Sequence, residues 1–385
     1  MTFYEGYPFF STLAVILLPA ILIGMAGKPL KWYSTAATYL FIGLVFFNKP
    51  TQALYLAAYY VIQVAIVMGY LHLRRIKGRI VWMYRLALAL SILPLIVSKL
   101  ALFLDMDLFG FLGISYLTFR CVQIIIEAYD GVIESISVLE FTAFLLFFPS
   151  LSSGPIDRSR RFLSDWNTVY TREEYMELAG TGIYKILLGL IYKLVIASFF
   201  YQGMGMVNGA KDWYYVIAYA YCYGFYLFFD FAGYSLMAIG TSYILGIRTP
   251  ENFRRPFLSI DIKEFWDRWH ITLSHWFRDF LFSRFMIQSI RKKRFQNRLN
   301  AASAGFLVNM FVMGLWHGLT PSYILYGLYH GALLAVTERW QKKSAFYKTH
   351  KSKRWYRFAS WFITLQLVML GFYIFDGKLL WLLGF

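Results

Sequence analysis

The chain has 385 residues, of which 59% are hydrophobic, 21% are aromatic and 15% are charged, and its formal net charge is +17. Apolar runs long enough to cross a membrane recur from end to end without a long polar linker, which excludes an ordinary soluble multidomain protein. The composition predicts an all-α polytopic membrane protein. In such a protein an excess of lysine and arginine marks cytoplasmic loops and lipid headgroup contacts, so we expect membrane lipids and no nucleic acid as partners.

The apolar stretches predict about eleven transmembrane helices, at roughly 20 residues for each crossing, together with shorter interfacial or re-entrant helices. The first stretch lacks a basic leader and a small-residue cleavage site, so we expect a retained span and not a removed signal peptide. The stretch at 212–246 is long enough for two passes. In chain order the stretches lie near 8–26, 33–48, 52–72, 81–98, 101–119, 121–133, 138–151, 178–201, 212–246, 303–319, 322–337 and 356–383.

Basic residues orient these crossings. Clusters of lysine and arginine follow the first and the third stretch, whereas the connection between the second and the third carries only Lys49. Because cytoplasmic loops are enriched in Lys and Arg, the N-terminus is predicted to lie outside. The stretches at 303–319 and 322–337 then form a hairpin that runs outward and back. Three later segments are cytoplasmic by the same rule, namely 154–177, 247–300 and 338–357.

A few isolated residues in apolar runs need an interpretation. Cys121 and Cys222 are interpreted as packing residues, because two such cysteines form neither a disulfide framework nor a metal site. Asp230 lies in an apolar run and is predicted to pair with a buried arginine, with a functional role as the alternative.

The segment "DIKEFWDRWHITLSHWFRDF" (261–280) is the densest polar and aromatic stretch of the chain. Its apolar side chains recur at helical spacing, which predicts one amphipathic helix with a tryptophan-rich stripe. On that helix His270 would lie one turn from Trp266 and from Ser274, facing a polar cavity. The alternative is an amphipathic helix on the membrane surface. The stripe consists of Ile262, Trp266, Trp269, Leu273, Trp276 and Phe280.

The hairpin carries two histidines, His317 and His330, in apolar surroundings. An ionisable group within a span is costly and usually faces the protein interior or a water-filled cavity. A histidine there stays neutral and can accept a proton near pH 7, which a general base requires. For His317, next to Trp316, catalysis, a structural hydrogen bond and metal ligation all stay open, although no Cys, Asp or Glu lies at ligand spacing. His330 is interpreted as structural.

Together these motifs resemble the membrane-bound O-acyltransferase family. The resemblance rests on "FFDFAGYSLMAIGTSYILGIRTPENFRRPFLSIDIKEFWDRWHITLSHWFRDF" (228–280) and "GLWHG" (314–318), with "GISYLTFR" (113–120) and "FPSLSSGPIDR" (148–158) as earlier landmarks. It extends over nearly the whole chain, so residues 1–385 are expected to form a single integral-membrane O-acyltransferase domain. It also implies a ring of helices around a thin central floor pierced by a tunnel.

The resemblance implies roles for particular residues. The deeply placed catalytic histidine of the family falls on His317, and its second motif residue falls on His270. Trp266, Trp269, Ser274 and Trp316 would line the substrate tunnel. The chain itself is expected to bind neither a metal nor a cofactor, because a thioester donor already carries an activated carbonyl.

Within the family, the likeness is greatest to the branch that transfers D-alanine in the teichoic-acid pathway of Gram-positive bacteria. It implies a multi-pass protein of the bacterial plasma membrane. The donor would be D-alanine held as a thioester on the phosphopantetheine arm of an acidic carrier protein in the cytoplasm. The acceptor would be a hydroxyl on the outer side, on lipoteichoic acid itself or on a partner that relays D-alanine. Since the alginate-acetylating branch shares both histidine motifs, a polysaccharide O-acetylase is an alternative.

The segment 280–300 offers a docking surface for such a carrier. Segment 247–300 holds 12 Lys and Arg against 5 Asp and Glu. If 280–300 is helical, Met286 and Ile290 share a face with Lys293 or Arg294, which combines an apolar contact with a positive rim. Binding to lipid headgroups is the alternative. The residues predicted to bind the carrier are Met286, Ile287, Ile290, Lys293 and Arg298.

Two other classes of protein stay open at the level of the sequence. A transporter of a lipid-linked sugar or acyl donor could use the histidines as a proton relay. A scaffold could recruit a biosynthetic complex without catalysis. An enzyme is distinguished from both by an acylated product whose formation depends on His317.

Overall fold

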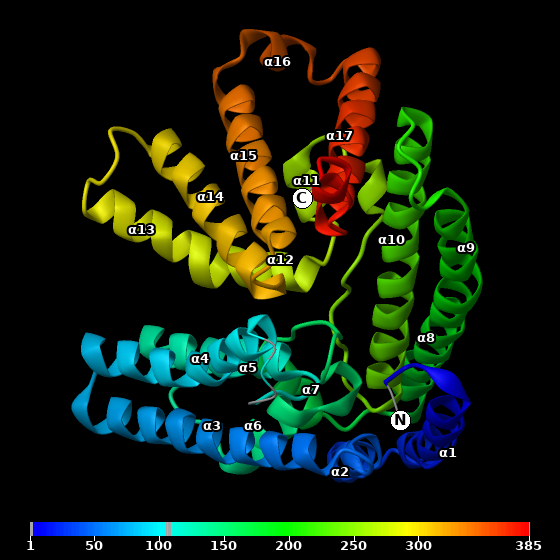
Figure 1. Cartoon of the computed structure of the whole chain (residues 1–385). Coiled ribbons are helices and arrows are strands. Elements are labelled where there is room, and N and C mark those ends of the chain that lie inside the picture. The colour runs from blue at the N-terminus through cyan, green and yellow to red at the C-terminus, as the bar shows by residue number, and fades with distance from the viewer. Residues whose placement is uncertain (1–2, 105, 107–108, 385) are drawn as a thin grey trace. The chain divides into compact units, whose positions relative to one another are not determined.

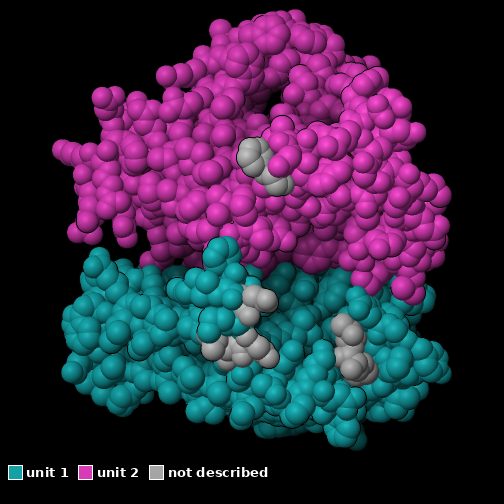
Figure 2. Space-filling view, in the orientation of Figure 1, with its two compact units in different colours: residues 1–190, 233–250 teal, residues 191–232, 251–385 magenta. Residues whose placement is uncertain are grey.

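The protein is all-helical in the computed structural model, which describes residues 3–104, 106 and 109–384. Every regular element among these residues is a helix, and the helices gather into two compact units (Figures 1 and 2). Unit 1 comprises 1–190 and 233–250, and unit 2 comprises 191–232 and 251–385. The long helix α10 (Trp213–Ile244) contributes to both. That residues 1–385 act as a single domain stays a prediction.

Unit 1 has a large apolar core. Helices α3, α4 and α5 pack against one another in it (Figure 1). Aromatic side chains fill much of the core, and the rings of Phe41 and Phe148, for example, stack with their centroids 4.1 Å apart. The helices of this unit are α1 (Gly6–Met25), α2 (Lys31–Phe46), α3 (Pro50–Lys77), α4 (Val81–Phe103), α5 (Ile114–Asp130), α6 (Val138–Leu146), α7 (Ser159–Trp166) and α8 (Arg172–Leu190), with the 3-10 turn η1 (Phe148–Ser150).

Close packing of α8 on the end of α10 in unit 1 depends on paired glycines. A Cβ at Gly182 would lie 2.7 Å from the carbonyl oxygen of Gly240, and a Cβ at Gly189 would lie 2.7 Å from that of Gly233. Side chains do not tolerate such distances, so glycine at these positions lets the two backbones approach. This is the small-residue packing that holds helices together in membranes, where burial of apolar surface contributes little.

Unit 2 is built around the antiparallel pair α14 and α15, which lie side by side (Figure 1). Helix α17 packs on α15, and the short α16 bridges the ends of these two helices. The helices are α9 (Ala197–Val207), α11 (Ile262–Trp266), α12 (Ile271–Phe277), α13 (Ser283–Arg291), α14 (Arg298–His317), α15 (Pro321–Lys343), α16 (Ala345–His350), α17 (Arg354–Phe375) and α18 (Lys378–Leu382), with the short segments η2 (Ile191–Ile196), η3 (Pro256–Leu258) and η4 (Arg278–Phe282).

Seven helical segments of the described chain are long and apolar enough to cross a membrane. They confirm the prediction of an all-α, multi-pass membrane protein, whereas the number of about eleven crossings stays a prediction. The segments are Gly6–Met25, Pro50–Lys77, Val81–Phe103, Arg172–Val207, Trp213–Ile244, Arg298–His317 and Arg354–Phe375.

Two apolar stretches fold differently from the prediction. The two passes considered for 212–246 are wrong, because α10 runs unbroken for 32 residues. At a rise of 1.5 Å per residue it is about 48 Å long, and it contains no proline that would interrupt its hydrogen bonds. The stretch at 101–119 is not one element, since α4 ends at Phe103 and α5 begins at Ile114.

Candidate active site

His270 lies in a break between two short helices. The single helix predicted over 261–280 is wrong: α11 ends at Trp266, α12 begins at Ile271, and His270 between them has a left-handed backbone with φ of +42°. Asn252 explains the break, because its carbonyl oxygen accepts from the Ile271 amide at 2.8 Å. This long-range bond takes the place of a local helical one. His270 therefore lies outside the helix of Trp266 and caps the start of the helix that contains Ser274, whose amide donates to the His270 carbonyl.

Asn252 also holds the side chain of His270. The Asn252 Oδ1 atom lies 2.9 Å from His270 Nδ1 and accepts from the Thr272 hydroxyl at 2.9 Å. Because an amide oxygen accepts and cannot donate, Nδ1 is inferred to carry the proton, and Nε2 is then the basic nitrogen of the ring. The histidine is only 4% exposed, and Phe231 meets it edge-on with ring centroids 4.8 Å apart.

The surroundings keep His270 uncharged. Burial, reinforced by the neighbouring His317, lowers the pKa of His270 to about 3. An imidazolium in this position would lose its hydration, which disfavours the charged form of the ring. His270 is therefore a neutral, oriented imidazole at physiological pH.

His317 is the last residue of α14, at the tight crossing of α14 and α15. Two glycines create this crossing: a Cβ at Gly314 would clash with the Tyr323 carbonyl, and a Cβ at Gly327 would clash with that of Met310. The helix hairpin that the sequence predicts from 303 to 337 is confirmed by the packing of α14 on α15. The imidazole of His317 lies among aromatic rings, with centroid distances of 4.7 Å to Trp316, 5.0 Å to Phe375, 5.9 Å to Tyr323 and 6.2 Å to Tyr326.

The two histidines line one cavity in unit 2, with a volume of about 160 Å³. Apart from them its lining is almost entirely aromatic and aliphatic, so a group that enters it is shielded from bulk water. Polar interactions are stronger in such low-polarity surroundings than in water. The other lining residues are Leu227, Phe231, Trp266, Trp269, Leu273, Met313, Tyr326, Phe372 and Phe375.

The four residues predicted to line the tunnel occupy different positions. Trp266 and Trp269 line the cavity. Trp316 packs against the His317 ring, and the Ser274 hydroxyl donates to the Trp269 carbonyl at 3.1 Å. Trp266 is also notable because its buried indole N–H has no hydrogen-bond partner among the described residues. Other buried donors of the described residues, Arg120 Nε among them, also lack a partner, but Trp266 is the one that lines this cavity.

Sequence reasoning did not single out Asn252. It belongs to the Asn-Phe pair within the motif at 228–280, and that membership was its only signal, since its contact with His270 crosses 18 positions of the chain. Asp230 pairs with Lys193 at 2.6 Å, so the predicted ion pair is present with a lysine as the partner instead of an arginine.

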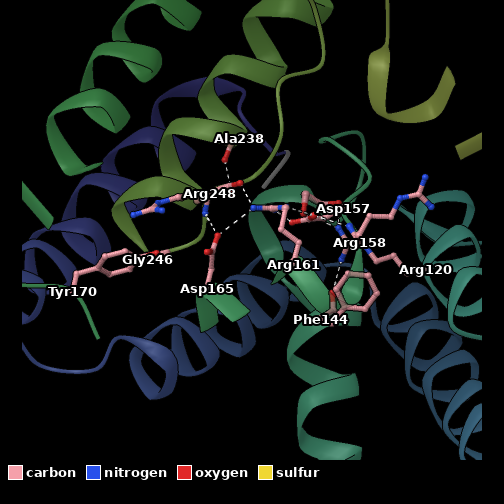
Figure 3. A network of polar contacts seen from close by, with 12 residues as sticks. Arg120, Phe144, Asp157, Arg158, Arg161, Asp165, Tyr170, Ala238, Gly246 and Arg248 are labelled. Carbon is pink, nitrogen blue, oxygen red and sulfur yellow. Dashed lines mark hydrogen bonds and ion pairs between the residues drawn. The ribbon is translucent and has the colours of Figure 1, made fainter. Parts of the chain in front are cut away.

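A second cluster of buried charges lies in unit 1 and joins the two earlier landmarks of the sequence (Figure 3). Arg120 is 2% exposed and donates to the carbonyls of Phe144 at 2.9 Å and Leu145 at 2.7 Å. It also donates to the carbonyl and hydroxyl oxygens of Ser150, at 2.6 and 2.7 Å.

The same cluster continues through Asp157, which accepts from the Arg158 amide at 2.6 Å and from Arg161 Nε at 2.7 Å. Arg161 reaches on to Asp165 at 3.1 Å, and Asp165 accepts from the Arg248 amide at 2.7 Å. These bonds tie α7 to the segment that follows α10 (Figure 3). The cluster is a structural brace.

The segment predicted to dock a carrier protein forms the short helix α13. Ile287 and Ile290 are 66% and 52% exposed, and Met286 is half-buried. The helix ends at Arg291, and Lys293 has a left-handed backbone with φ of +49°. The shared helical face of Met286, Ile290 and Lys293 is therefore wrong, because Lys293 lies beyond the helix and Arg298 opens the next one. The basic residues follow the exposed isoleucines as a loop.

Comparison with known proteins decides the family. The model of the membrane-bound O-acyltransferase family matches residues 51–376. The chain belongs to this family. It is 42% identical to the teichoic acid D-alanyltransferase of Bacillus subtilis over 98% of both chains, and 39% identical to that of Streptococcus thermophilus over 97% of this chain and 95% of the relative. A probable alginate O-acetylase of Azotobacter vinelandii is 34% identical over 69% of this chain and 51% of its own.

Family membership settles the class of reaction. This member of the membrane-bound O-acyltransferase family is an O-acyltransferase and a multi-pass bacterial membrane protein. Acyl transfer to oxygen requires that a hydroxyl lose its proton as it attacks a carbonyl carbon. A neutral imidazole in a cavity shielded from water suits that step.

Proposed function

We propose that the chain transfers D-alanine to a hydroxyl in teichoic-acid D-alanylation. The observation that carries the proposal is the pairing of His270 and His317 on one apolar cavity. The choice of D-alanine is supported by the near full-length similarity to teichoic acid D-alanyltransferases, compared with coverage of 69–71% of this chain for the probable alginate O-acetylases.

The donor in this proposal is D-alanine bound as a thioester to the phosphopantetheine arm of a cytoplasmic carrier protein. The acceptor hydroxyl lies on the outer side, on lipoteichoic acid or on a partner that relays D-alanine. The arm crosses much of the membrane through a tunnel, in a ring of about eleven crossings with the N-terminus outside. This places the protein in the plasma membrane of a Gram-positive bacterium.

His317 acts as the general base. The acceptor oxygen attacks the carbonyl carbon of the thioester while His317 takes the hydroxyl proton, and the carbon–sulfur bond then breaks. The leaving sulfur takes that proton and departs as the thiol of the arm, so the step needs neither a metal nor a nucleophile from the protein. A positioned base contributes roughly 10²–10⁴-fold to such a rate.

His270 and Trp266 orient the donor. The hydrogen bond with Asn252 fixes the His270 ring and presents Nε2 as an acceptor or proton carrier. The buried indole N–H of Trp266 offers a hydrogen bond to a carbonyl of the arm, which would supply the partner that the described residues do not. Both contacts hold the thioester in the cavity while water is excluded.

The carrier protein docks on α13. The exposed Ile287 and Ile290, together with Met286, form an apolar anchor for its surface. The loop from Lys292 to Arg294, and Arg298 after it, attract its acidic residues and increase the rate of association.

The central test mixes the purified protein with carrier proteins loaded with labelled D-alanine or labelled acetate and follows the label to a hydroxyl acceptor. We expect transfer of D-alanine, and its loss in His317→Ala. Preferential transfer of acetate would favour a polysaccharide O-acetylase. Transport of the donor without an acylated product would indicate a transporter, and transfer that survives in His317→Ala would indicate a scaffold.

Docking is tested separately by measuring carrier binding. Ile287→Asp places a charge in the apolar anchor and should abolish binding and transfer while the protein still inserts into the membrane. Neutralising Lys292 and Lys293 to Gln should chiefly slow association and reduce its dependence on salt. Carrier affinity unchanged by Ile287→Asp would assign this surface to lipid headgroups.

A further inference from the structure

A second cavity in unit 2 lies apart from the residues assigned to catalysis. It has a volume of about 730 Å³, is open to the surface, and is lined by α15, α16 and α17, with the start of α11 on a further wall. Ligand pockets usually measure about 300–1,000 Å³. In Figure 1 the short α16 spans from the end of α15 to the start of α17, above the space between them.

One end of this cavity is cationic. Lys351 and Arg357 line it, and the side chains of both have no ion-pair partner among the described residues. They belong to the segment 338–357, which holds eight Lys and Arg against the single acidic residue Glu338. Glu338 is already paired with Lys263 at 2.6 Å. The cationic end therefore favours an anion.

The one carboxylate in the lining is also engaged. Asp261 accepts from Gln341 Nε2 at 2.9 Å and from the Glu264 amide at 2.9 Å, where it caps α11. Both carboxylate oxygens of Asp261 therefore already accept hydrogen bonds from the protein.

The other end of the cavity is apolar and lies along a membrane span. Ile363 and Leu367 line it from α17, whose residues Arg354–Phe375 are apolar enough to cross a membrane. Val336 lines it from α15, and Val336 and Ile363 are 63% and 58% exposed.

Large aromatic side chains lie near the cationic end, where Trp355 is two residues before Arg357 and the Phe346 ring packs against that of Trp355. Trp340, Phe346 and Trp355 line the cavity and are 47%, 47% and 53% exposed. Tryptophan is enriched where the hydrocarbon of a membrane meets its headgroups. A cationic and aromatic end followed by an aliphatic end matches the headgroup and the acyl chains of a phospholipid.

We propose that this cavity binds one anionic phospholipid molecule. Its phosphate group contacts Lys351 and Arg357, and an acyl chain lies along Val336, Ile363 and Leu367. The apolar end distinguishes this site from one for a free phosphate, because two exposed cations alone hold a small anion weakly in water.

The lipid would contact the start of α11, the short helix that precedes His270 in the chain. There the Ile260 carbonyl accepts from the hydroxyls of Ser360 at 2.6 Å and Thr364 at 3.2 Å, which ties α17 to the start of α11. A lipid that fills the cavity adds contacts to α11, α15 and α17 together. Its binding therefore raises the stability of the folded protein.

The test is native mass spectrometry of the purified full chain in a zwitterionic detergent. Phosphatidylglycerol, phosphatidylcholine with the same acyl chains, and glycerol 3-phosphate are added in equal amounts. We expect one phosphatidylglycerol to be retained in preference to both other compounds, and the melting temperature to rise with phosphatidylglycerol alone. Equal retention of phosphatidylcholine, or equal protection by glycerol 3-phosphate, would overturn the proposal.

Variants separate the site from general attraction to basic loops. Lys351→Gln with Arg357→Gln should weaken retention by about 30-fold, for two cations at a lipid headgroup. The matched control, Lys342→Gln with Lys343→Gln, removes the same charge from exposed residues outside the cavity lining and should keep the wild-type affinity.

A variant that fills the cavity provides an independent test. Ala359→Trp should block the lipid while both cations remain, and its melting temperature without lipid reports whether it folds. If the control pair weakened retention as much as the cavity pair, or if a folded Ala359→Trp retained the lipid, the attraction would not arise in this cavity.

Discussion

The Arg120 cluster in unit 1 and the histidine cavity in unit 2 both bury polar groups, but they differ in the space around those groups. Arg120 makes four hydrogen bonds to Phe144, Leu145 and Ser150 through its two terminal nitrogens, and its Nε atom has no partner among the described residues. The cavity of His270 and His317 retains about 160 Å³ of space and the buried Trp266 N–H without a partner among the described residues.

This difference distinguishes a structural cluster of buried charges from a site that binds a ligand. Leaving a buried polar group without a partner costs about 1–3 kcal/mol, so a protein retains such a group where a ligand or water supplies the bond. Burial and charge alone would have ranked Arg120 as the stronger candidate. Each region has one buried N–H donor without a partner in the described part of the chain, on Arg120 and on Trp266, so the space beside the two histidines is what favours the cavity.

The largest expected effect is on catalysis at the cavity. His317→Ala should reduce D-alanine transfer by about 10²–10⁴-fold, the usual contribution of a positioned general base. The melting temperature should change little, because the variant keeps the helix crossing at Gly314. Transfer assays on purified protein measure the rate, and thermal unfolding measures the melting temperature. The matched control is His72→Ala, an exposed histidine of α3; wild-type rates in His317→Ala would remove the distinction between brace and site.

The converse holds for Arg120. Arg120→Met should lower the free energy of unfolding by about 3–5 kcal/mol, since it leaves buried acceptors without their donor. Turnover per folded molecule should stay near the wild-type value. Arg172→Met, at an exposed position of α8, serves as the control. A variant of normal stability that had lost turnover would show that Arg120 takes part in the reaction.

A smaller effect is expected where orientation alone is lost. Asn252→Leu removes the bond to His270 Nδ1 and should slow transfer by about 10–100-fold, because a small displacement of a positioned group is costly to the rate. Asn252→Asp keeps an acceptor oxygen and should retain more activity. The pH dependence of transfer is then compared between the two variants. In Asn252→Asp the new carboxylate favours the charged form of the His270 ring, so a difference between the two pH profiles identifies an effect on His270. Identical losses in the two variants would contradict a role in orientation.

The smallest effect concerns the pH dependence of stability. The pKa of His270 is lowered to about 3 in the folded protein, so between that value and 6.5 the unfolded chain binds the extra proton. Stability should therefore fall as the pH falls through this range, with His270 contributing about 1 kcal/mol between pH 7 and pH 5.5. Thermal unfolding at the two pH values measures it, and His270→Gln should lose less. An equal loss in the variant would mean that other groups carry the dependence.

Much of the fold and of the candidate site could be predicted from the sequence. Apolar runs predict the helical membrane class, because the length of a span and its lack of charge are local properties. The motifs at 228–280 and 314–318 predict the family and single out His270 and His317. The helix hairpin from 303 to 337 follows from its apolar runs and the Thr-Pro break between them.

Contacts between distant segments decided the rest. Helical periodicity predicts one helix over 261–280, but bonds from Asn252, 18 or more positions away, hold His270 in a left-handed turn instead. Periodicity describes only neighbours along the chain, and a hydrogen bond from elsewhere can outweigh it at a single residue. For the same reason Arg120 could not be recognised as a brace, since its acceptors lie 24 to 30 positions further along the chain. The sequence determined which residues could act, and the long-range hydrogen bonds of the tertiary structure decided which of them are satisfied by the protein and which face a cavity.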